Sequence, residues 1–214
     1  AFSLPLVLKE ISLLKCKKLV IVDKNDYETI NAIKNYDCIV HKQITSGYGN
    51  ALIEGINKID TEYLCIFNAD GSFQPKDLSK MLELNSSGND FVFASRYLKN
   101  GGSDDDTIIT LVGNYIFSFL GKFFFGLNIS DILYTYLMGK SSTFKELELK
   151  SNDFRICVEI PILLNFKKKS YISIPSHERS RLGGKKKVNA VKDGFYILLK
   201  MIQLYFVKIL NVSK

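Results

Sequence analysis

Short apolar runs that alternate with segments of helical periodicity are the feature that most constrains the fold of this chain. An apolar run between polar flanks predicts a buried strand, whereas apolar residues every three or four positions predict a helix. A chain that alternates the two builds βαβ units around a largely parallel sheet. We expect strands at residues 18–23, 38–41, 63–67, 91–94 and 171–175. We expect helices at 4–14, 27–34, 48–59, 107–127, 154–166 and 192–211, and a further helix that starts at Pro75. Loops are expected at 100–106 and 176–189.

The composition fits one domain of this class and argues against several kinds of site. A length of 214 residues is enough for an α/β domain with a real core. The four cysteines are far apart and form no CxxC pair, and two histidines are too few for a His-based metal site. A disulfide framework or a zinc site is therefore not expected, and a reducing, cytosolic setting fits.

The beginning of the sequence differs from that of a complete open α/β domain. Such a domain normally begins with a strand, but residues 4–14 have a helical pattern. We therefore expect the first strand to be missing, which would make this sequence a fragment.

Basic residues are concentrated in the C-terminal third of the chain. The net charge is +7, and much of the excess lies at residues 167–169 and 179–187. Such clusters suit phosphate ligands, anionic lipid or nucleic acid, although a solvated face is the default for any single lysine. No nucleic-acid partner is expected, because the basic stretch lacks interleaved aromatic residues and no nucleic-acid motif occurs.

An acidic corner follows the central apolar run. The run at 63–67 stops at Asn68, Asp70 and Ser72, and an Asp just beyond the carboxyl end of a strand lies at the edge where open α/β folds bind ligands. A carboxylate beside an amide and a hydroxyl suits Mg²⁺ or Mn²⁺, which would in turn bind phosphate oxygens. The alternative is a plain turn, since these are also the usual turn residues.

Two apolar helices are candidates for contact with a membrane. The pattern at 192–211 is amphipathic, with Lys192, Lys200 and Lys208 in one arc and large apolar residues opposite. This segment is too short and charged to span a bilayer, so it either lies in the membrane interface or packs on the domain core. The apolar segment 107–127 contains glycines and Lys122, which favour an interfacial or core helix over a spanning one.

Several short motifs follow one another in a recognisable order. They are LPLVLKEI at 4–11, VIVD at 20–23, GYGNA at 47–51, NAD at 68–70, ASRY at 94–97, SD at 130–131 and RLGGKKK at 181–187. Together they resemble glycosyltransferase family 2, and within it the polyprenyl-phosphate glycosyltransferases such as dolichol-phosphate mannose synthase. The sequence departs from the family pattern at Asn68, where the DxD motif has its first Asp, and after Asp23, where Lys24 replaces the usual second Asp.

The resemblance implies a fold and a division of the chain. The fold would be a GT-A-like (Rossmann-like) three-layer α/β sandwich with a mostly parallel central sheet, followed by C-terminal amphipathic helices. Residues 1–187 would form the glycosyltransferase domain without its first strand, and residues 188–214 an amphipathic, membrane-interface helix.

The resemblance also implies a reaction. A sugar would pass from a GDP- or UDP-sugar to a polyprenyl (dolichyl-type) phosphate at the cytoplasmic face of a membrane, with Mg²⁺ or Mn²⁺ as cofactor. The protein would be cytoplasmic and peripheral to, or anchored at, the membrane. The implied site residues are Asp23, Asp26, Asn68 and Asp70 for the donor, Asp70, Asn68 and Ser72 for the metal, Arg96, Arg181 and Lys187 for the acceptor phosphate, and Asp131 and Arg96 for catalysis.

Other interpretations of these residues stay open. An anionic phosphate acceptor needs positioning more than a base, whereas a saccharide hydroxyl would need one, and Asp131 would then be that base. Asp131 is also compatible with a helix N-cap, Arg96 with a strand-end salt bridge, and Arg181 and Lys187 with a solvated basic loop. A catalytically degenerate nucleotide-sugar binder is a further alternative, because Asn68 is neutral.

Overall fold

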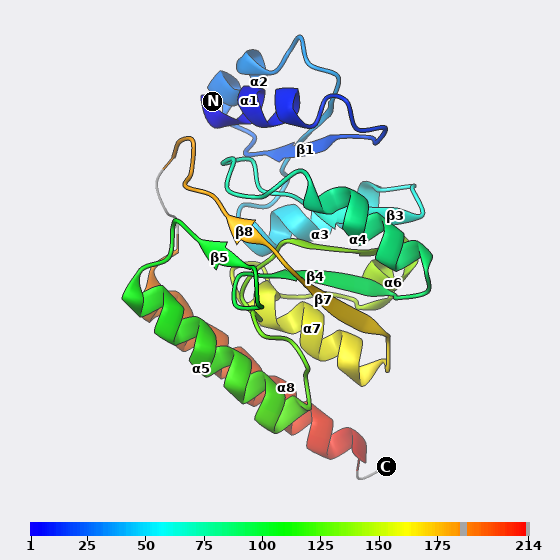
Figure 1. The fold of residues 1–214 in the computed structure, drawn as a ribbon, viewed down its shortest axis with the longest axis vertical. Helices are drawn as coiled ribbons and strands as arrows, with labels where there is room; N and C mark the ends of the chain where they lie inside the picture. The colour runs from blue at the N-terminus through cyan, green and yellow to red at the C-terminus, as the bar shows by residue number, and fades with distance from the viewer. Residues whose placement is uncertain (185–187, 213–214) are drawn as a thin grey trace.

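The computed structural model describes residues 1–184 and 188–212, and it places most of the expected elements within a few residues of their predicted bounds (Figure 1). The helices are α1 (Ser3–Glu10), α2 (Tyr27–Ala32), α3 (Tyr48–Lys58), α4 (Asp77–Ser86), α5 (Ile108–Phe125), α6 (Ser141–Glu146), α7 (Ile156–Phe166) and α8 (Ala190–Val212). The strands are β1 (Leu19–Val22), β2 (Ile39–Lys42), β3 (Tyr63–Ile66), β4 (Phe91–Ser95), β5 (Gly102–Ser103), β6 (Leu137–Lys140), β7 (Tyr171–Pro175) and β8 (His177–Glu178).

The central sheet is mixed, with the strand order β3-β6-β4-β7. Parallel pairing, as predicted, joins β4 to β7 and, in a separate two-stranded sheet, β1 to β2. The short strands β5 and β8, also parallel, lie in segments that were predicted to be loops. Strand β6 was not predicted, and it runs antiparallel to both β3 and β4. The sequence pattern hides it because Gly139 interrupts a four-residue strand, and that glycine is required: a Cβ there would lie 2.8 Å from the Phe91 ring.

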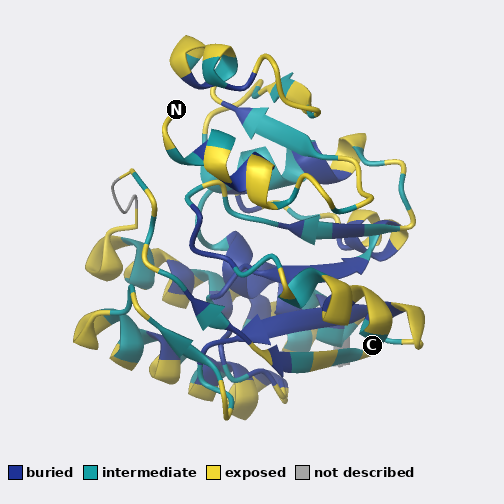
Figure 2. Cartoon of the chain, turned by 45° about the horizontal axis from the view of Figure 1, so that its top comes forward, coloured by how far each residue is buried: buried dark blue, intermediate teal, exposed yellow. Residues whose placement is uncertain are grey.

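Strand β4 packs against the hydrophobic core on both of its faces. All five of its residues are buried, as Figure 2 shows for the middle of the sheet. Phe91 and Phe93 point into one hydrophobic cluster, with α7, whereas Val92 and Ala94 point into a second cluster, with Met81 of α4. The sheet therefore lies between helices on both sides, so the layered α/β fold expected from the alternating pattern is confirmed.

Helices α5 and α8 lie side by side along one flank of the molecule (Figure 1). Helix α8 packs on the core through Ile197, Met201 and Leu204. Its Lys200 also turns inward, where Nζ lies 2.7 Å from Oε1 of the buried Glu159 on α7. Part of the arc expected to be polar thus faces the protein, and a large apolar stripe of α8 faces outward.

The start of α3 is fixed by close backbone packing. Gly47 precedes the helix with a φ of 126°, and the N–H of Gly49 donates to the carbonyl of Asn152 at 3.0 Å. A Cβ on Gly49 would lie 2.0 Å from the carbonyl oxygen of Ser151. The motif at 47–51 therefore shapes a helix start, and its glycines allow the chain before α7 to approach.

We predict that Gly49→Ala destabilises the protein by at least about 2 kcal/mol, because the backbone around residue 151 must move to admit a methyl group. Gly113→Ala is the matched control: it also lies in a helix, and its added Cβ meets no atom within 4 Å. The control should stabilise the protein by up to about 1 kcal/mol through higher helix propensity. Urea unfolding measures both, and equal effects of the two substitutions would contradict the packing argument.

Candidate active site

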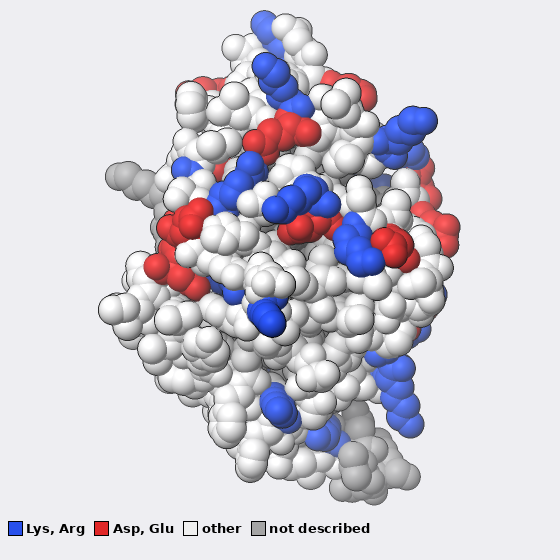
Figure 3. Space-filling view, in the orientation of Figure 1, with Lys and Arg blue, Asp and Glu red and all other residues white. Residues whose placement is uncertain are grey.

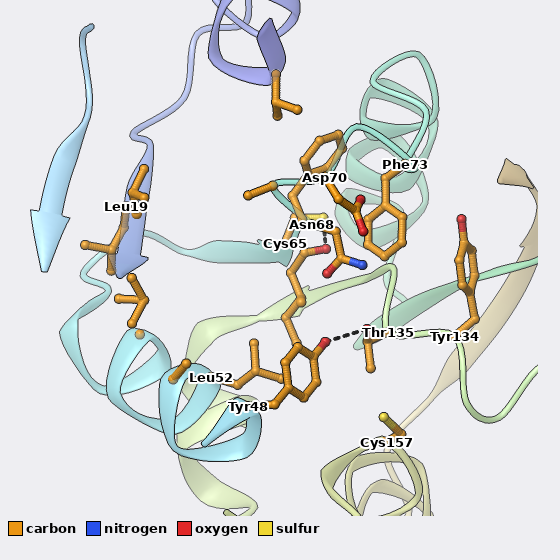
Figure 4. Close-up of a pocket in the computed structure, with 18 of the residues that line it drawn as sticks. Leu19, Tyr48, Leu52, Cys65, Asn68, Asp70, Phe73, Tyr134, Thr135 and Cys157 are labelled. Carbon is orange, nitrogen blue, oxygen red and sulfur yellow. Dashed lines mark hydrogen bonds between the residues drawn. The ribbon is translucent and has the colours of Figure 1, made fainter. Parts of the chain in front are cut away.

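The acidic corner lies at the carboxyl end of β3, as predicted. Asp70 Oδ1 accepts hydrogen bonds from the Ser72 N–H at 3.0 Å and from the Ser72 hydroxyl at 2.7 Å. Figure 4 shows Asn68 and Asp70 beside each other, with Phe73 and Tyr134 nearby. Ser72 is 1% exposed, and its two hydrogen bonds hold the Asp70 carboxylate in place. The Ser72 hydroxyl uses its proton on Asp70, and the role of Ser72 as a metal ligand stays a prediction.

The basic loop after β8 lies directly over this corner. The N–H of Leu182 donates to the carbonyl of Asp70 at 2.8 Å, and that of Arg179 to the carbonyl of Ser72 at 2.9 Å. Gly71, at a φ of 84°, permits the approach, since a Cβ there would lie 2.6 Å from the Leu182 side chain. The structure thus brings together two motifs that are far apart in the sequence.

Arg181 faces the acidic corner from this loop. Its Nη1 lies 3.8 Å from Asp70 Oδ2, and its Nε donates to Asp105 Oδ2 at 3.1 Å. A guanidinium next to a carboxylate at the end of a strand suits the binding of a diphosphate, whose negative charge both the arginine and a bound cation would neutralise. Lys187, the other predicted phosphate ligand in this loop, lies outside the described residues.

One large cavity, of about 2070 Å³, collects most of the predicted site residues. Asp23 lines it, with its Oδ1 accepting from the Asn25 N–H at 2.9 Å, and so does Asp26, which caps α2 by accepting from the Thr29 N–H at 3.0 Å. The predicted site residues along its wall are Asp23, Asp26, Asn68, Asp70, Arg96 and Arg181.

Arg96 is buried among carboxylates rather than open to a ligand. Its Nε and Nη2 donate to Asp131 at 2.7 and 2.9 Å, and its Nη1 donates to Glu178 at 2.9 Å and to Asp106 at 3.2 Å. Burial works to lower the pKa of Arg96, but hydrogen bonding to Asp131 and the nearby negative charges raise it overall, so the guanidinium stays charged. These carboxylates occupy most of the Arg96 donors, and a role for Arg96 at the acceptor phosphate stays a prediction.

Asp131 is the buried partner of this arginine. Its side chain is fully buried, and its two carboxylate oxygens accept from the side chain and backbone N–H of Arg96. No α-helix begins at residue 131, so the N-cap interpretation is wrong. The strand-end salt bridge considered for Arg96 is the arrangement that the structure contains.

Three participants in the site were missed at the level of sequence. Glu178 of β8 and Asp106 of the loop before α5 pair with Arg96, and both lie in charged segments that were predicted to be loops, so nothing marked them among their neighbours. The ring of Tyr134 lies 4.6 Å from the Arg96 guanidinium in a cation–π contact. The sequence signal for Tyr134 was its position shortly after the SD motif at 130–131.

The residues at the corner fit a divalent cation that shares its coordination with a ligand. Within the described ranges, no group of three or more His, Cys, Asp or Glu side chains could hold a metal by itself. Mg²⁺, however, is commonly bound by one or two carboxylates together with substrate phosphates. Asp70 supplies one carboxylate and Asn68 a neutral oxygen, so phosphate oxygens would have to complete the coordination.

Comparison with known proteins decides the family. The family model described as glycosyl transferase family 2 matches residues 8–148. The chain belongs to glycosyl transferase family 2. The resemblance drawn from the short motifs is thereby confirmed.

Two curated relatives of this family 2 chain were found. Glycosyltransferase AglJ of Haloferax volcanii is 26% identical over 163 residues, which are 74% of this chain and 53% of that protein. Polyprenol monophosphomannose synthase of Mycolicibacterium smegmatis is 25% identical over 128 residues, 58% of this chain and 48% of that protein. The chain therefore spans about half the length of the curated relatives it matches.

Solved structures show that the family 2 chain has the GT-A fold. Glucosyl-3-phosphoglycerate synthase from Mycobacterium tuberculosis, in complex with Mn²⁺, uridine diphosphate and glucosyl-3-phosphoglycerate, superposes with a TM-score of 0.70 at 12% identity, covering 94% of this chain and 75% of that one. Mannosyl-3-phosphoglycerate synthase from Rubrobacter xylanophilus gives 0.69 at 15% identity, covering 99% and 71%.

We predict that Arg96→Met destabilises the protein by about 3–5 kcal/mol, because it leaves Asp131 buried without its cation. Arg155→Met is the matched control: it breaks an Arg–Asp pair with Asp153 in which both side chains are more than a third exposed, and it should cost less than about 1 kcal/mol. Urea unfolding at neutral pH measures both. An Arg96→Met protein of normal stability would contradict the structural role.

Proposed function

We propose that this chain carries the catalytic site of a metal-dependent glycosyltransferase that moves a sugar from a nucleotide-sugar donor to a polyprenyl phosphate at a membrane surface. The main support is that Asp70 and Arg181 lie next to each other in one cavity, beside the exposed apolar helices α5 and α8. The membership in family 2 and a relative named polyprenol monophosphomannose synthase support it.

The donor side follows from the charge of the leaving group. A nucleoside diphosphate gains negative charge as the glycosidic bond breaks, and a divalent cation held at Asp70 would stabilise that charge as a Lewis acid. Ser72 fixes the Asp70 carboxylate by two hydrogen bonds, so the ligand oxygen is positioned in advance. Arg181 adds a positive charge beside this carboxylate, with Nη1 3.8 Å from Asp70 Oδ2. Asp23, at the end of β1, lines the same cavity and is available to the nucleoside.

The acceptor side favours a phosphate over a saccharide hydroxyl. A hydroxyl acceptor needs a general base within hydrogen-bond reach. Asp131, the base considered for that reaction, has both oxygens bonded to Arg96 and none of its surface exposed. A phosphate monoester is already anionic near neutral pH and needs mainly cationic groups to position it, which the basic loop at 179–184 provides.

The surface proposed to contact the membrane is the outer face of α5 and α8. Exposed side chains of α5 include Ile108, Phe119 and Phe123, at 81%, 63% and 70%, and α8 exposes Phe195 and Phe206 at about 60%. Among the described residues, α5 is the helix whose length and mean hydropathy of 1.6 would suffice to cross a membrane, and 22% of it is buried. In Figure 3 the surface over α5, at the lower left, is mostly uncharged, while charged side chains gather across the middle. An apolar surface of this kind suits the interface of a bilayer.

We predict that the full-length protein transfers labelled sugar from a UDP- or GDP-sugar to polyprenyl phosphate in the presence of Mn²⁺ or Mg²⁺. Asp70→Ala should lower kcat/KM at least about a hundredfold, since it removes the carboxylate that would hold the cation. The matched control Asp37→Ala removes an acidic side chain that is fully exposed and should leave the rate unchanged.

The outcomes of this assay separate the alternatives. Transfer to 3-phosphoglycerate or to a saccharide, with none to polyprenyl phosphate, would replace the acceptor and keep the family chemistry. Binding of nucleoside diphosphate with Mn²⁺, but no turnover on any acceptor, would identify a degenerate binder. If Asp70→Ala transfers sugar at an unchanged rate, the acidic corner does not hold a cation that the reaction needs.

We predict that the protein binds vesicles of phosphatidylcholine with phosphatidylglycerol and that Phe119→Ser with Phe123→Ser weakens binding at least about tenfold. Each buried phenylalanine contributes about 1.5–3 kcal/mol when it leaves water. Leu13→Ser, at a residue that is 94% exposed outside this surface, is the control and should not weaken binding. Vesicle sedimentation measures all three proteins, and equal binding would exclude α5 as the contact surface.

A further inference from the structure

Arg181 lies between two carboxylates that come from different segments of the chain. Its Nε donates to Asp105 Oδ2 at 3.1 Å, and its Nη1 lies 3.8 Å from Asp70 Oδ2. The three side chains are between 21% and 24% exposed, so solvent screens their charges less than it does at an open surface. Asp70 therefore has a cationic neighbour within its own chain.

The carboxylates on both sides of this guanidinium are held by their own segments. Asp70 Oδ1 accepts both hydrogen bonds from Ser72, and Oδ2 is the oxygen that faces Arg181. The Asp105 N–H donates to the Ser103 hydroxyl oxygen at 3.1 Å. Arg181 thus meets two acidic groups whose positions do not depend on the arginine alone.

The charges at this corner are unfavourable for a divalent cation that arrives alone. Mg²⁺ and Mn²⁺ prefer anionic oxygen ligands, and here Asp70 supplies one carboxylate whereas Asn68 is neutral. The Arg181 guanidinium already balances part of the Asp70 charge, and it would repel a further positive charge at the same carboxylate. A cation without other ligands would therefore gain little by binding here.

A diphosphate reverses the sign of this effect. Its oxygens can bind the cation and also accept hydrogen bonds from a guanidinium, which presents several N–H donors in a fixed geometry. Arg181 and the cation would then share one anionic ligand instead of competing for Asp70. Asp105 engages Nε, whereas Nη1 is directed at the corner, where the diphosphate would lie.

We propose that Arg181 is the built-in counter-ion of Asp70, which opposes a divalent cation that arrives alone and favours one that is bound together with a nucleoside diphosphate. The nucleotide then brings its cation with it, and Asp105 is the positioning residue that keeps Arg181 at the corner. This inference rests on the proposed function, since it concerns how the donor and its cation occupy that site.

Two binding measurements without an acceptor test the proposal. Electron paramagnetic resonance of free Mn²⁺ measures the binding of Mn²⁺ alone, and titration calorimetry measures the binding of UDP and GDP at saturating Mn²⁺. Arg181→Gln should bind Mn²⁺ alone at least about threefold more tightly and the nucleotide at least about tenfold more weakly. The opposite signs are decisive, because a variant with a merely loosened site would bind both ligands more weakly.

Three further variants assign these changes to particular side chains. Adding Asp70→Ala to Arg181→Gln should remove the tightened Mn²⁺ site. Asp105→Asn keeps the guanidinium but weakens its anchor, so it should weaken nucleotide binding without tightening the binding of Mn²⁺ alone. Arg155→Gln is the control and should change neither, since Arg155 pairs with Asp153 at 2.7 Å and, among the described residues, neither lines the cavity.

The outcomes separate this proposal from the proposed function. Mn²⁺ alone that binds no more tightly to Arg181→Gln than to the unaltered chain would overturn the proposal, as would unchanged nucleotide binding by that variant. Failure of both UDP and GDP to bind the unaltered chain would overturn the donor side of the proposed function and this proposal with it. Both expected binding changes, without sugar transfer to polyprenyl phosphate, would overturn the proposed acceptor and support the role of Arg181.

Discussion

A guanidinium buried among carboxylates is the interaction on which the rest of the site depends. Arg96 follows β4, and its donors reach Asp131, Glu178 and Asp106, which come from three other segments of the chain. Any one of these charges buried without a counter-charge would cost several kcal/mol. The four segments are therefore stable only when they come together, and their meeting forms one wall of the cavity.

The position of the basic loop follows from that interaction. Glu178 is fixed by Arg96 and by the Ser103 hydroxyl, which donates to it at 2.7 Å, and the loop begins at the next residue. Arg179 is then held by two hydrogen bonds to Glu10 of α1, at 3.0 and 2.8 Å. Arg181 reaches the acidic corner because Glu178 and Arg179 are held before it and the Leu182 N–H donates to the Asp70 carbonyl after it. A buried network thus places a partly buried cation, Arg181, beside the Asp70 carboxylate.

The sequence predicted the elements whose signals are local. β7 has its expected bounds, and β3 ends at the corner expected for Asp70, because an apolar run bounded by polar residues marks a buried strand. It did not reveal β6, whose apolar pattern is broken by a glycine that is explained only by the ring of Phe91 packing on it. It also placed Lys200 in a polar arc, whereas a buried partner on another helix, Glu159, draws it inward.

The sequence by itself determined the class of fold, the family and the position of the acidic corner after β3, because periodicity and short motifs are properties of neighbouring residues. Tertiary structure decided which charges are available to a ligand. Arg96 and Arg181 look equivalent as sequence, yet one is surrounded by acidic groups from distant segments and the other faces the cavity. Burial and pairing depend on contacts across the chain, and these exist only once the sheet and its loops have assembled.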